Sequence, residues 1–103
     1  MVPSILRPVA LYVSLLKWSK GPGSARDWRR RVDAQAKLIE SRGGALKHSY
    51  VTLGRFDVVL LFEAPSDEVA TGIILGIAES QSVVSETMRA FAPEEADAIM
   101  RSL

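Results

Sequence analysis

The amino-acid sequence predicts an α+β protein with the ferredoxin-like order βαββαβ: a four-stranded antiparallel sheet, two main helices and an additional C-terminal helix. Three observations support this prediction. Residues 9–18 and 82–91 alternate in character with a period of two, residues 58–62 are all apolar, and residues 24–42 and 66–79 have apolar positions at helical spacing. Because crossover connections are right-handed, both long helices fall on one face of the sheet and leave the other face open.

The chain begins with an expected arm, residues 1–8, which carries two prolines, and residues 9–103 then form one domain. Residues 9–18 predict the first strand. One face of this strand carries Leu11, Val13 and Leu15, and the other carries Tyr12, Ser14, Leu16 and Trp18. We expect the second face, together with Tyr50 from the next strand, to lie on the open side of the sheet.

Residues 24–42 predict the first helix. Gly21-Pro22-Gly23 breaks the chain before it, and Ser24 with Asp27 resembles a capping box. Apolar residues recur at spacings of three and four and form one stripe, which consists of Ala25, Trp28, Val32, Ala36 and Ile39. The Gly43-Gly44 pair ends the helix.

The same helix carries a series of basic side chains: Arg26, Arg29, Arg30, Arg31, Lys37 and Arg42. Acidic residues interrupt this series, and no aromatic residues are interleaved on the polar face. A solvated helix face is therefore a better interpretation than a nucleic-acid interface, and we expect no nucleic-acid partner.

Residues 45–64 predict an antiparallel hairpin that contains His48, the one histidine of the chain. The mixed alternation of residues 46–53 is typical of an outer strand, whereas the apolar residues 58–62 are typical of a central strand with both faces sheltered. Between the strands, Gly54 permits a positive φ and Asp57 is suited to bond turn amides with its side chain.

The last third of the sequence predicts a helix, a strand and a short helix. Residues 66–79 begin with a polar cap and early acids, which favour a helix start. Gly72 and Gly76 each cost this helix about 1 kcal/mol relative to alanine, so we expect a packing reason for them. Residues 82–91 predict the fourth strand, and Pro93 stands at the first position of the terminal helix.

The composition excludes several classes of function. The chain has 103 residues, of which 48% are hydrophobic, and a net charge of +1, which gives no strong field towards nucleic acid or acidic lipid. The lack of cysteine excludes disulfides, thiolate nucleophiles and cysteine metal sites, and a single histidine excludes a histidine-rich metal site. We therefore expect neither a metal nor a cofactor.

No stretch of the sequence approaches the roughly 20 apolar residues that a membrane helix needs. The apolar run at residues 9–16 is short and lacks the small-residue cleavage site of a signal peptide. We therefore expect a cytoplasmic protein with no membrane partner.

Three segments, in this order and spacing, resemble the GYD domain family: ALYVSLLKW at 10–18, YVTLGRFDVVLLFEAPSDE at 50–68 and SETMRAFAPEE at 85–95. The Gly-Tyr-Asp signature of the family corresponds here to Gly54, Phe56 and Asp57, with Arg55 inside it. Phenylalanine in place of tyrosine removes a phenol hydroxyl from the signature. The resemblance implies a dimeric α/β barrel, in which two sheets pack face to face.

The open face of the sheet is the predicted site, an aromatic-lined cavity whose candidate binding residues are Tyr12, Ser14, Trp18, Tyr50, Glu86 and Arg89. His48 is the candidate general base, because an imidazole exchanges protons near neutral pH. A single histidine on an outer strand is more often a surface or interface residue than a catalytic base. Arg55 and Asp57 are expected to brace the hairpin through a salt bridge or backbone bonds.

Two functions remain open at this point. The first is a homo-oligomeric small-molecule binding or assembly module, favoured because no Ser-His-Asp arrangement, phosphate loop or paired-carboxylate motif is evident. The second is a cofactor-independent enzyme of the monooxygenase or cyclase type that acts on an aromatic or polyketide-like substrate, with His48 as base. Both involve a second copy of the chain, as a homodimer or a higher assembly, and both admit a small aromatic ligand.

Overall fold

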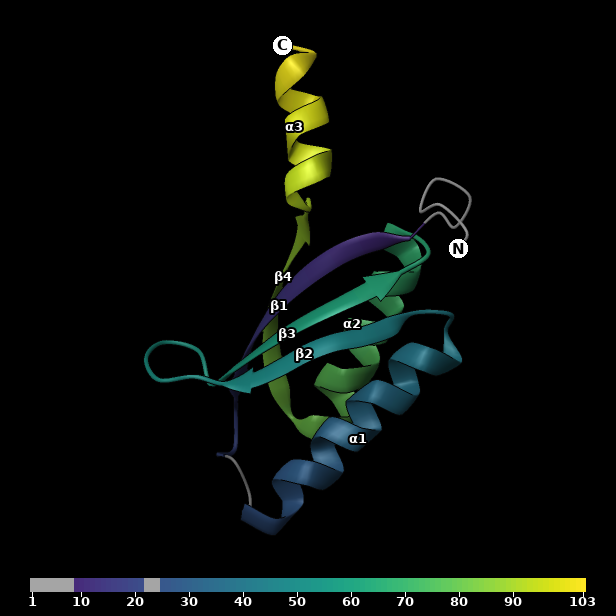
Figure 1. Ribbon diagram of the computed structural model, residues 1–103. Helices are drawn as coiled ribbons and strands as arrows, with labels where there is room; N and C mark the ends of the chain where they lie inside the picture. Colours follow the sequence, from purple (N-terminus) through teal and green to yellow (C-terminus); the bar gives the residue numbers. More distant parts are fainter. Residues whose placement is uncertain (1–8, 22–24) are drawn as a thin grey trace.

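The computed structural model describes residues 9–21 and 25–103, so the predicted arm at 1–8 and the predicted cap at Ser24 lie outside the described residues. The predicted order of elements is confirmed (Figure 1). The elements are β1 (Ala10–Trp18), α1 (Ala25–Ser41), β2 (Ala45–Val51), β3 (Val58–Ala64), α2 (Asp67–Gln81), β4 (Val83–Ala90) and α3 (Pro93–Arg101). The four strands form one antiparallel sheet in the order β2-β3-β1-β4.

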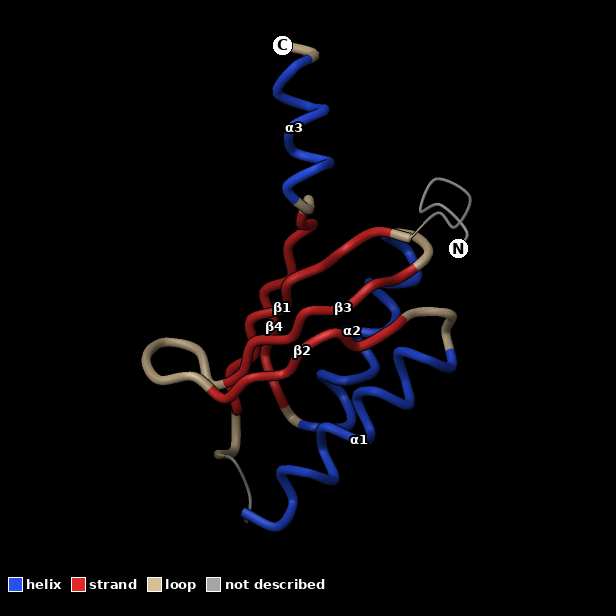
Figure 2. Tube along the Cα trace, viewed as in Figure 1, coloured by secondary structure: helices blue, strands red, loops and turns tan. Residues whose placement is uncertain are grey.

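The two long helices cover one face of this sheet, as Figure 2 shows. Every second residue of β3 lies under them, and each of these residues is fully buried: Val58, Leu60, Phe62 and Ala64. On α2 the buried face consists of Ala70, Ile73, Ile74 and Ile77. The core therefore lies between the sheet and the helices, and no element in the described part of the chain covers the opposite face of the sheet.

The helices cover the face of β1 that carries Tyr12 and Leu16. From the sequence, this face is expected to lie on the open side of the sheet. Tyr12 is paired with Phe62 and Leu16 with Val58, so these β1 side chains share the helix side with the buried face of β3. Tyr12 is only 4% exposed and Leu16 1%. The expectation that they face the open side is wrong because both faces of β1 are apolar, and alternation alone does not indicate which of two apolar faces is covered.

A bulge in β2 changes which residues share a face. Leu46 pairs with Phe62 while His48 pairs with Leu61, so Lys47 is the extra residue between two consecutive partners. Leu46 therefore lies on the helix side, whereas His48 and Tyr50 lie on the open side, as expected for Tyr50.

The second helix begins and ends at recognisable caps. The Ser66 hydroxyl accepts a hydrogen bond from the Val69 amide at 3.1 Å, and Asp67 and Glu68 occupy the first turn, where the helix dipole favours acids. At the other end Ser82 adopts a left-handed conformation with φ of 53°, and its amide donates to the Ala78 carbonyl. This turn leads directly into β4.

The terminal helix, α3, projects away from the body of the protein (Figure 1) and buries none of its residues. Its first turn is held by the Ala92 amide, which donates to the Glu95 carboxylate at 2.9 Å. An apolar stripe recurs along it at positions three and four apart, Ala96, Ile99 and Met100, and Met100 is 65% exposed. Within the described residues 9–21 and 25–103, every helix is too short or too polar to cross a membrane.

Two glycines allow backbones to approach closely. A Cβ at Gly44 would lie 2.2 Å from the Glu63 carbonyl oxygen, and one at Gly76 would lie 3.0 Å from a methyl group of Leu38 on α1. Gly76 therefore has a packing reason, since it lets α1 and α2 come together. At Gly72 a Cβ would meet only the flexible end of Arg42, at 3.5 Å.

These contacts predict opposite effects for two glycine-to-alanine substitutions. We expect Gly44→Ala to lower the free energy of unfolding by about 1–3 kcal/mol, because the new methyl group clashes with backbone. The control, Gly72→Ala, adds a methyl group without a clash and removes a helix-interior glycine, so it should raise stability by up to about 1 kcal/mol. Urea denaturation checks both values, and similar effects of the two substitutions would contradict this interpretation.

Candidate functional site

The sheet separates the predicted binding residues into two groups. Tyr12, Ser14, Trp18 and Arg89 lie on the helix side, whereas His48, Tyr50 and Glu86 lie on the open side. The predicted aromatic-lined cavity on the open face is therefore wrong, because Tyr12 and Trp18 belong to the other face. Trp18 instead packs edge-on against Trp28 of α1, with 6.5 Å between ring centroids.

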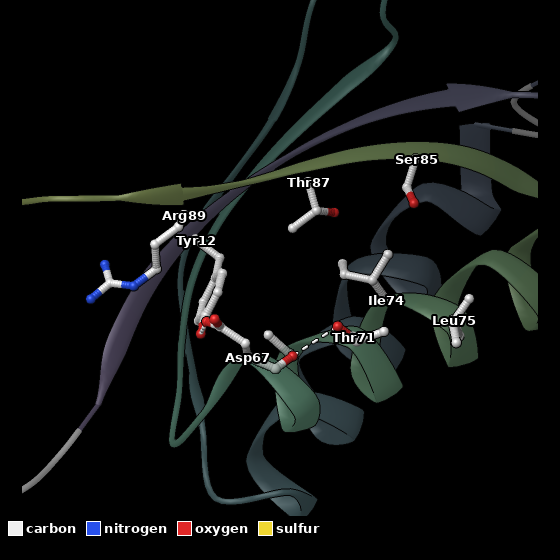
Figure 3. Close-up of a pocket in the computed structure, with 9 residues that line it drawn as sticks. Tyr12, Asp67, Thr71, Ile74, Leu75, Ser85, Thr87 and Arg89 are labelled. Carbon is white, nitrogen blue, oxygen red and sulfur yellow. Dashed lines mark hydrogen bonds between the residues drawn. The ribbon is translucent and has the colours of Figure 1, made fainter.

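A groove of about 400 Å³ lies between α2 and β4 on the helix side (Figure 3), and we call it the α2–β4 groove. It is lined by Tyr12, Asp67, Ala70, Thr71, Ile74, Leu75, Ser85, Thr87 and Arg89. The groove exists because β4 is an edge strand that α2 covers only in part. Leu75, on its wall, is left 64% exposed.

Tyr12 and Asp67 join the floor of the groove to the start of α2. The Tyr12 hydroxyl donates to the Asp67 carboxylate at 2.5 Å, and the Tyr12 ring stacks on Phe62 with 5.4 Å between centroids. Burial, then the hydrogen bond to Asp67 and the charge of that carboxylate, raise the pKa of Tyr12 from 10.0 to about 12. At neutral pH the hydroxyl is therefore a hydrogen-bond donor and not a base.

Arg89 provides positive charge at one end of the groove. Its guanidinium carbon lies 5.7 Å from the centre of the Tyr12 ring and 4.4 Å from that of Phe91, which is cation–π geometry. Its Nη1 donates to the carbonyl oxygens of Leu11 and Ala90. The side chain is thus held over the end of β4 and remains exposed.

Hydroxyl groups line the remaining polar part of the groove. Thr87 shares a hydrogen bond of 2.8 Å with Ser14, which is fully buried beneath it. The Thr71 hydroxyl donates to the Asp67 carbonyl at 2.8 Å (Figure 3). With apolar walls from Ile74 and Leu75, this combination of a cation, hydroxyls and apolar surface is suited to binding a small molecule.

The open face is mainly apolar. It carries Leu11, Val13, Leu15, Val59, Leu61, Val84 and Met88, together with the polar residues Lys17, His48, Tyr50, Glu63 and Glu86. The His48 and Tyr50 rings stack on each other with 5.6 Å between centroids and 11° between planes. His48 is thereby placed beside Tyr50 but on the other side of the sheet from Tyr12 and Trp18.

The hairpin residues of the family signature contact the end of β1. Gly54 has a φ of 106°, which favours glycine. The Asp57 carboxylate accepts from the Trp18 amide at 2.8 Å, and the Asp57 amide donates to the Leu16 carbonyl at 2.8 Å. Arg55 lies over the Phe56 ring at 5.8 Å. Asp57 therefore ties the β2–β3 turn to β1 through backbone bonds.

Several lining residues of the groove were not predicted from the sequence: Asp67, Ala70, Thr71, Ile74, Leu75, Ser85 and Thr87. Asp67 lies in the first turn of a predicted helix, where the helix dipole favours an acid. This position accounts for the residue without a binding role, so the sequence does not indicate that Asp67 lines a groove. Only the pairing of β1 with the rest of the sheet brings it to Tyr12, from which it is 55 positions away in the chain. Within the described part of the chain, no cluster of three metal-ligating side chains occurs.

The fold and the two surfaces define a ferredoxin-like α+β domain with one covered and one open sheet face. The GYD domain model matches residues 12–100, and the chain belongs to the GYD domain family. Among solved structures it is similar to an amidase of the hydantoinase/carbamoylase family from Burkholderia multivorans, with 14% sequence identity and a TM-score of 0.50. That similarity covers 81% of this chain and 27% of the amidase chain, so it bears on the fold alone. No curated protein matches in sequence.

The Tyr12–Asp67 contact predicts a measurable titration. In a Tyr50→Phe background, where Tyr12 is the remaining tyrosine, ultraviolet absorbance should report a pKa of about 12. We expect Asp67→Asn to lower this pKa, because the substitution removes the carboxylate that stabilises the protonated hydroxyl. The control, Glu68→Gln, removes a weaker charge contribution and should lower it less.

The same shift predicts how stability depends on pH. The folded-state pKa of Tyr12 lies above the ordinary value of 10.0, so the stability it contributes is complete below pH 10 and is lost as the pH rises toward 12. Denaturant unfolding across this window should show a smaller decline in Asp67→Asn. An equal decline in both proteins would contradict the assignment.

Proposed function

We propose that this member of the GYD family is a self-assembly module that pairs through the open face of its sheet and binds a small amphipathic molecule in the α2–β4 groove. The observation that carries the proposal is an apolar sheet face that no element of the described residues 9–21 and 25–103 covers. On this face Val84 is 64% exposed and Met88 45%. A contiguous apolar surface of this kind marks an interaction site, because its burial is favourable by roughly 25 cal/mol per Å².

The layout of the open face fits a second copy as the partner. The β2 edge of the open face carries His48, with Lys47 reaching to Glu63 at 3.6 Å, and the β4 edge carries Glu86. A two-fold axis parallel to the strands lays the β2 edge of one copy over the β4 edge of the other. Because Glu86 and Tyr50 both lie level with the Leu15–Val59 pair, that arrangement opposes Glu86 to Tyr50 twice. Isologous two-fold dimers are the commonest assembly of identical chains.

The terminal helix supports assembly independently. Its apolar stripe includes Ile99 and Met100, which are exposed, and the helix points away from the body of its own chain (Figure 1). Amphipathic helices are stabilised mainly by burying their apolar face against another surface. A neighbouring copy supplies such a surface in the assembly that we propose.

The α2–β4 groove is the small-molecule site of this proposal. Its volume of about 400 Å³ lies within the range of ligand pockets. Ile74 and Leu75 offer apolar walls to the body of a ligand, and Arg89 offers a cation to an anionic end. The ligand class is therefore a small amphipathic acid, for which benzoate is a simple aromatic probe.

The alternative function, a cofactor-independent monooxygenase or cyclase with His48 as general base, stays a prediction. It depended on one cavity that joined His48 to Tyr12 and Trp18, and the sheet lies between these groups. The observed neighbour of His48 is the stacked ring of Tyr50. We favour assembly because its apolar surface is present without any further rearrangement.

The proposed pairing predicts that a charge on the open face weakens self-association. We expect Met88→Glu to raise the dimer dissociation constant at least about tenfold, because a buried unpaired carboxylate costs more than 1.4 kcal/mol. The control is Leu53→Glu, which places the same charge on a residue that is fully exposed in the β2–β3 turn. Sedimentation velocity measures both proteins, and a monomeric wild type or equal effects would overturn the proposal.

The position of Arg89 in the α2–β4 groove predicts that this residue contributes to the binding of an anionic ligand. We expect Arg89→Gln to weaken benzoate binding about tenfold or more, because a charge-assisted hydrogen bond is lost. The control is Arg55→Gln, which removes an arginine that also lies over an aromatic ring but belongs to the turn. Calorimetric titration compares the three proteins, and an equal loss in both variants would place the ligand elsewhere.

A further inference from the structure

A second cavity, of about 260 Å³, lies between α1 and the C-terminal end of α2. We call it the α1–α2 cavity, and it is lined by Arg30, Arg31, Ala34, Ser80, Gln81 and Ser82. It is distinct from the α2–β4 groove, since the two share no lining residue. The inference drawn from it does not depend on the proposed function.

Arg31 in this cavity has a buried nitrogen without a hydrogen-bond partner. Among the described residues, its Nη1 is one of the few buried side-chain polar atoms left unpaired. A guanidinium stays charged at all physiological pH values, so it has no route to neutrality by losing a proton. A buried donor without a partner is costly, and such a group calls for an acceptor that enters the site.

The Gln81 side-chain oxygen and the Ser82 carbonyl are already engaged, whereas the Gln35 side-chain oxygen is itself buried without a partner. The Gln81 side-chain oxygen accepts from the Gln35 amide at 3.0 Å, and the Gln81 amide donates to the Arg31 carbonyl at 2.9 Å. The Ser82 carbonyl accepts from both the amide and the hydroxyl of Ser19, at 3.0 and 2.6 Å. These bonds hold the wall of the cavity in place, and they leave both the Arg31 Nη1 and the Gln35 Oε1 without a partner.

We propose that the α1–α2 cavity binds a small oxyanion of the phosphate or sulfate class. Arg31 supplies the buried donor, and Arg30 is the second cation that lines the cavity. Ser80 and Ser82 lie on the same wall; the Ser80 hydroxyl donates to the Ile77 carbonyl at 3.5 Å, and the Ser82 hydroxyl is a further donor. Acidic residues are not among the lining side chains, although Asp27 and Glu79 lie close in sequence on the same two helices.

The test is thermal unfolding in sodium phosphate compared with sodium chloride of equal ionic strength. We expect phosphate to raise the melting temperature of the wild-type protein, because a ligand that binds the folded state alone stabilises it. Sulfate should act similarly, acetate should act weakly, and glycerol phosphate distinguishes a phosphate ester from the free ion. No rise in any of these anions would overturn the proposal.

Variants locate the site. Arg31→Gln should weaken phosphate binding about tenfold or more in calorimetric titration, because charge-assisted bonds to the anion are lost. The matched control is Arg29→Gln, which changes an exposed arginine of the same helix outside the cavity. Equal binding by Arg31→Gln and the control would overturn the proposal.

A second variant keeps the test decisive if Arg31→Gln does not fold. Arg30→Gln changes an exposed side chain at the cavity, so its folding should be unaffected. We expect it to bind phosphate several-fold more weakly than Arg29→Gln, since it removes one cation from the site. Unchanged affinity in Arg30→Gln would contradict the placement of the anion between the two arginines.

Discussion

The pairing of β1 with β3 at the centre of the sheet is the constraint on which the rest of the structure depends. It places Tyr12 opposite Phe62 and Leu16 opposite Val58, so the same face of both strands lies under the helices. A shift of one residue would send Tyr12 to the open side and Leu11 beneath α2. Asp57 secures the register from one end, because its carboxylate and its amide bond the backbone of Trp18 and Leu16. The hairpin signature thus contributes to function by deciding which side chains reach each surface.

This register also creates the α2–β4 groove. Because Tyr12 lies on the helix side, its hydroxyl meets Asp67 at the start of α2, and its ring lies under Arg89 from the neighbouring strand. The edge position of β4 leaves these groups accessible beside α2. A central strand in the same place would be sheltered on both faces and would bury them. The groove therefore follows from two features of topology, the phase of β1 and the outer position of β4.

The sequence was sufficient for the order of elements, the helical stripes and the family, because each depends on local periodicity or on residues close together in the chain. It was insufficient for the phase of β1, since Leu11, Val13 and Leu15 are as apolar as Tyr12, Leu16 and Trp18. It was also insufficient for the bulge at Lys47, which has no glycine or proline to mark it. From the sequence, Asp67 is recognisable as an acid at the start of a helix. Its place in the groove follows from its contact with Tyr12, which lies 55 positions away in the chain.

Because the helices cover one side of the sheet, some surfaces and some single polar atoms are left without a partner. At the scale of the domain, an apolar face and the stripe of α3 are left for another surface, and the near-neutral net charge of +1 opposes association only weakly. At the scale of single atoms, packing two helices side by side on one face encloses Arg31 near Gln35 and Gln81. The Gln35 amide is paired with Gln81, whereas the Gln35 oxygen and the Arg31 Nη1 are left without a partner. In the assembly and the anion site that we propose, a partner satisfies these uncovered groups, and binding therefore raises the stability of the domain.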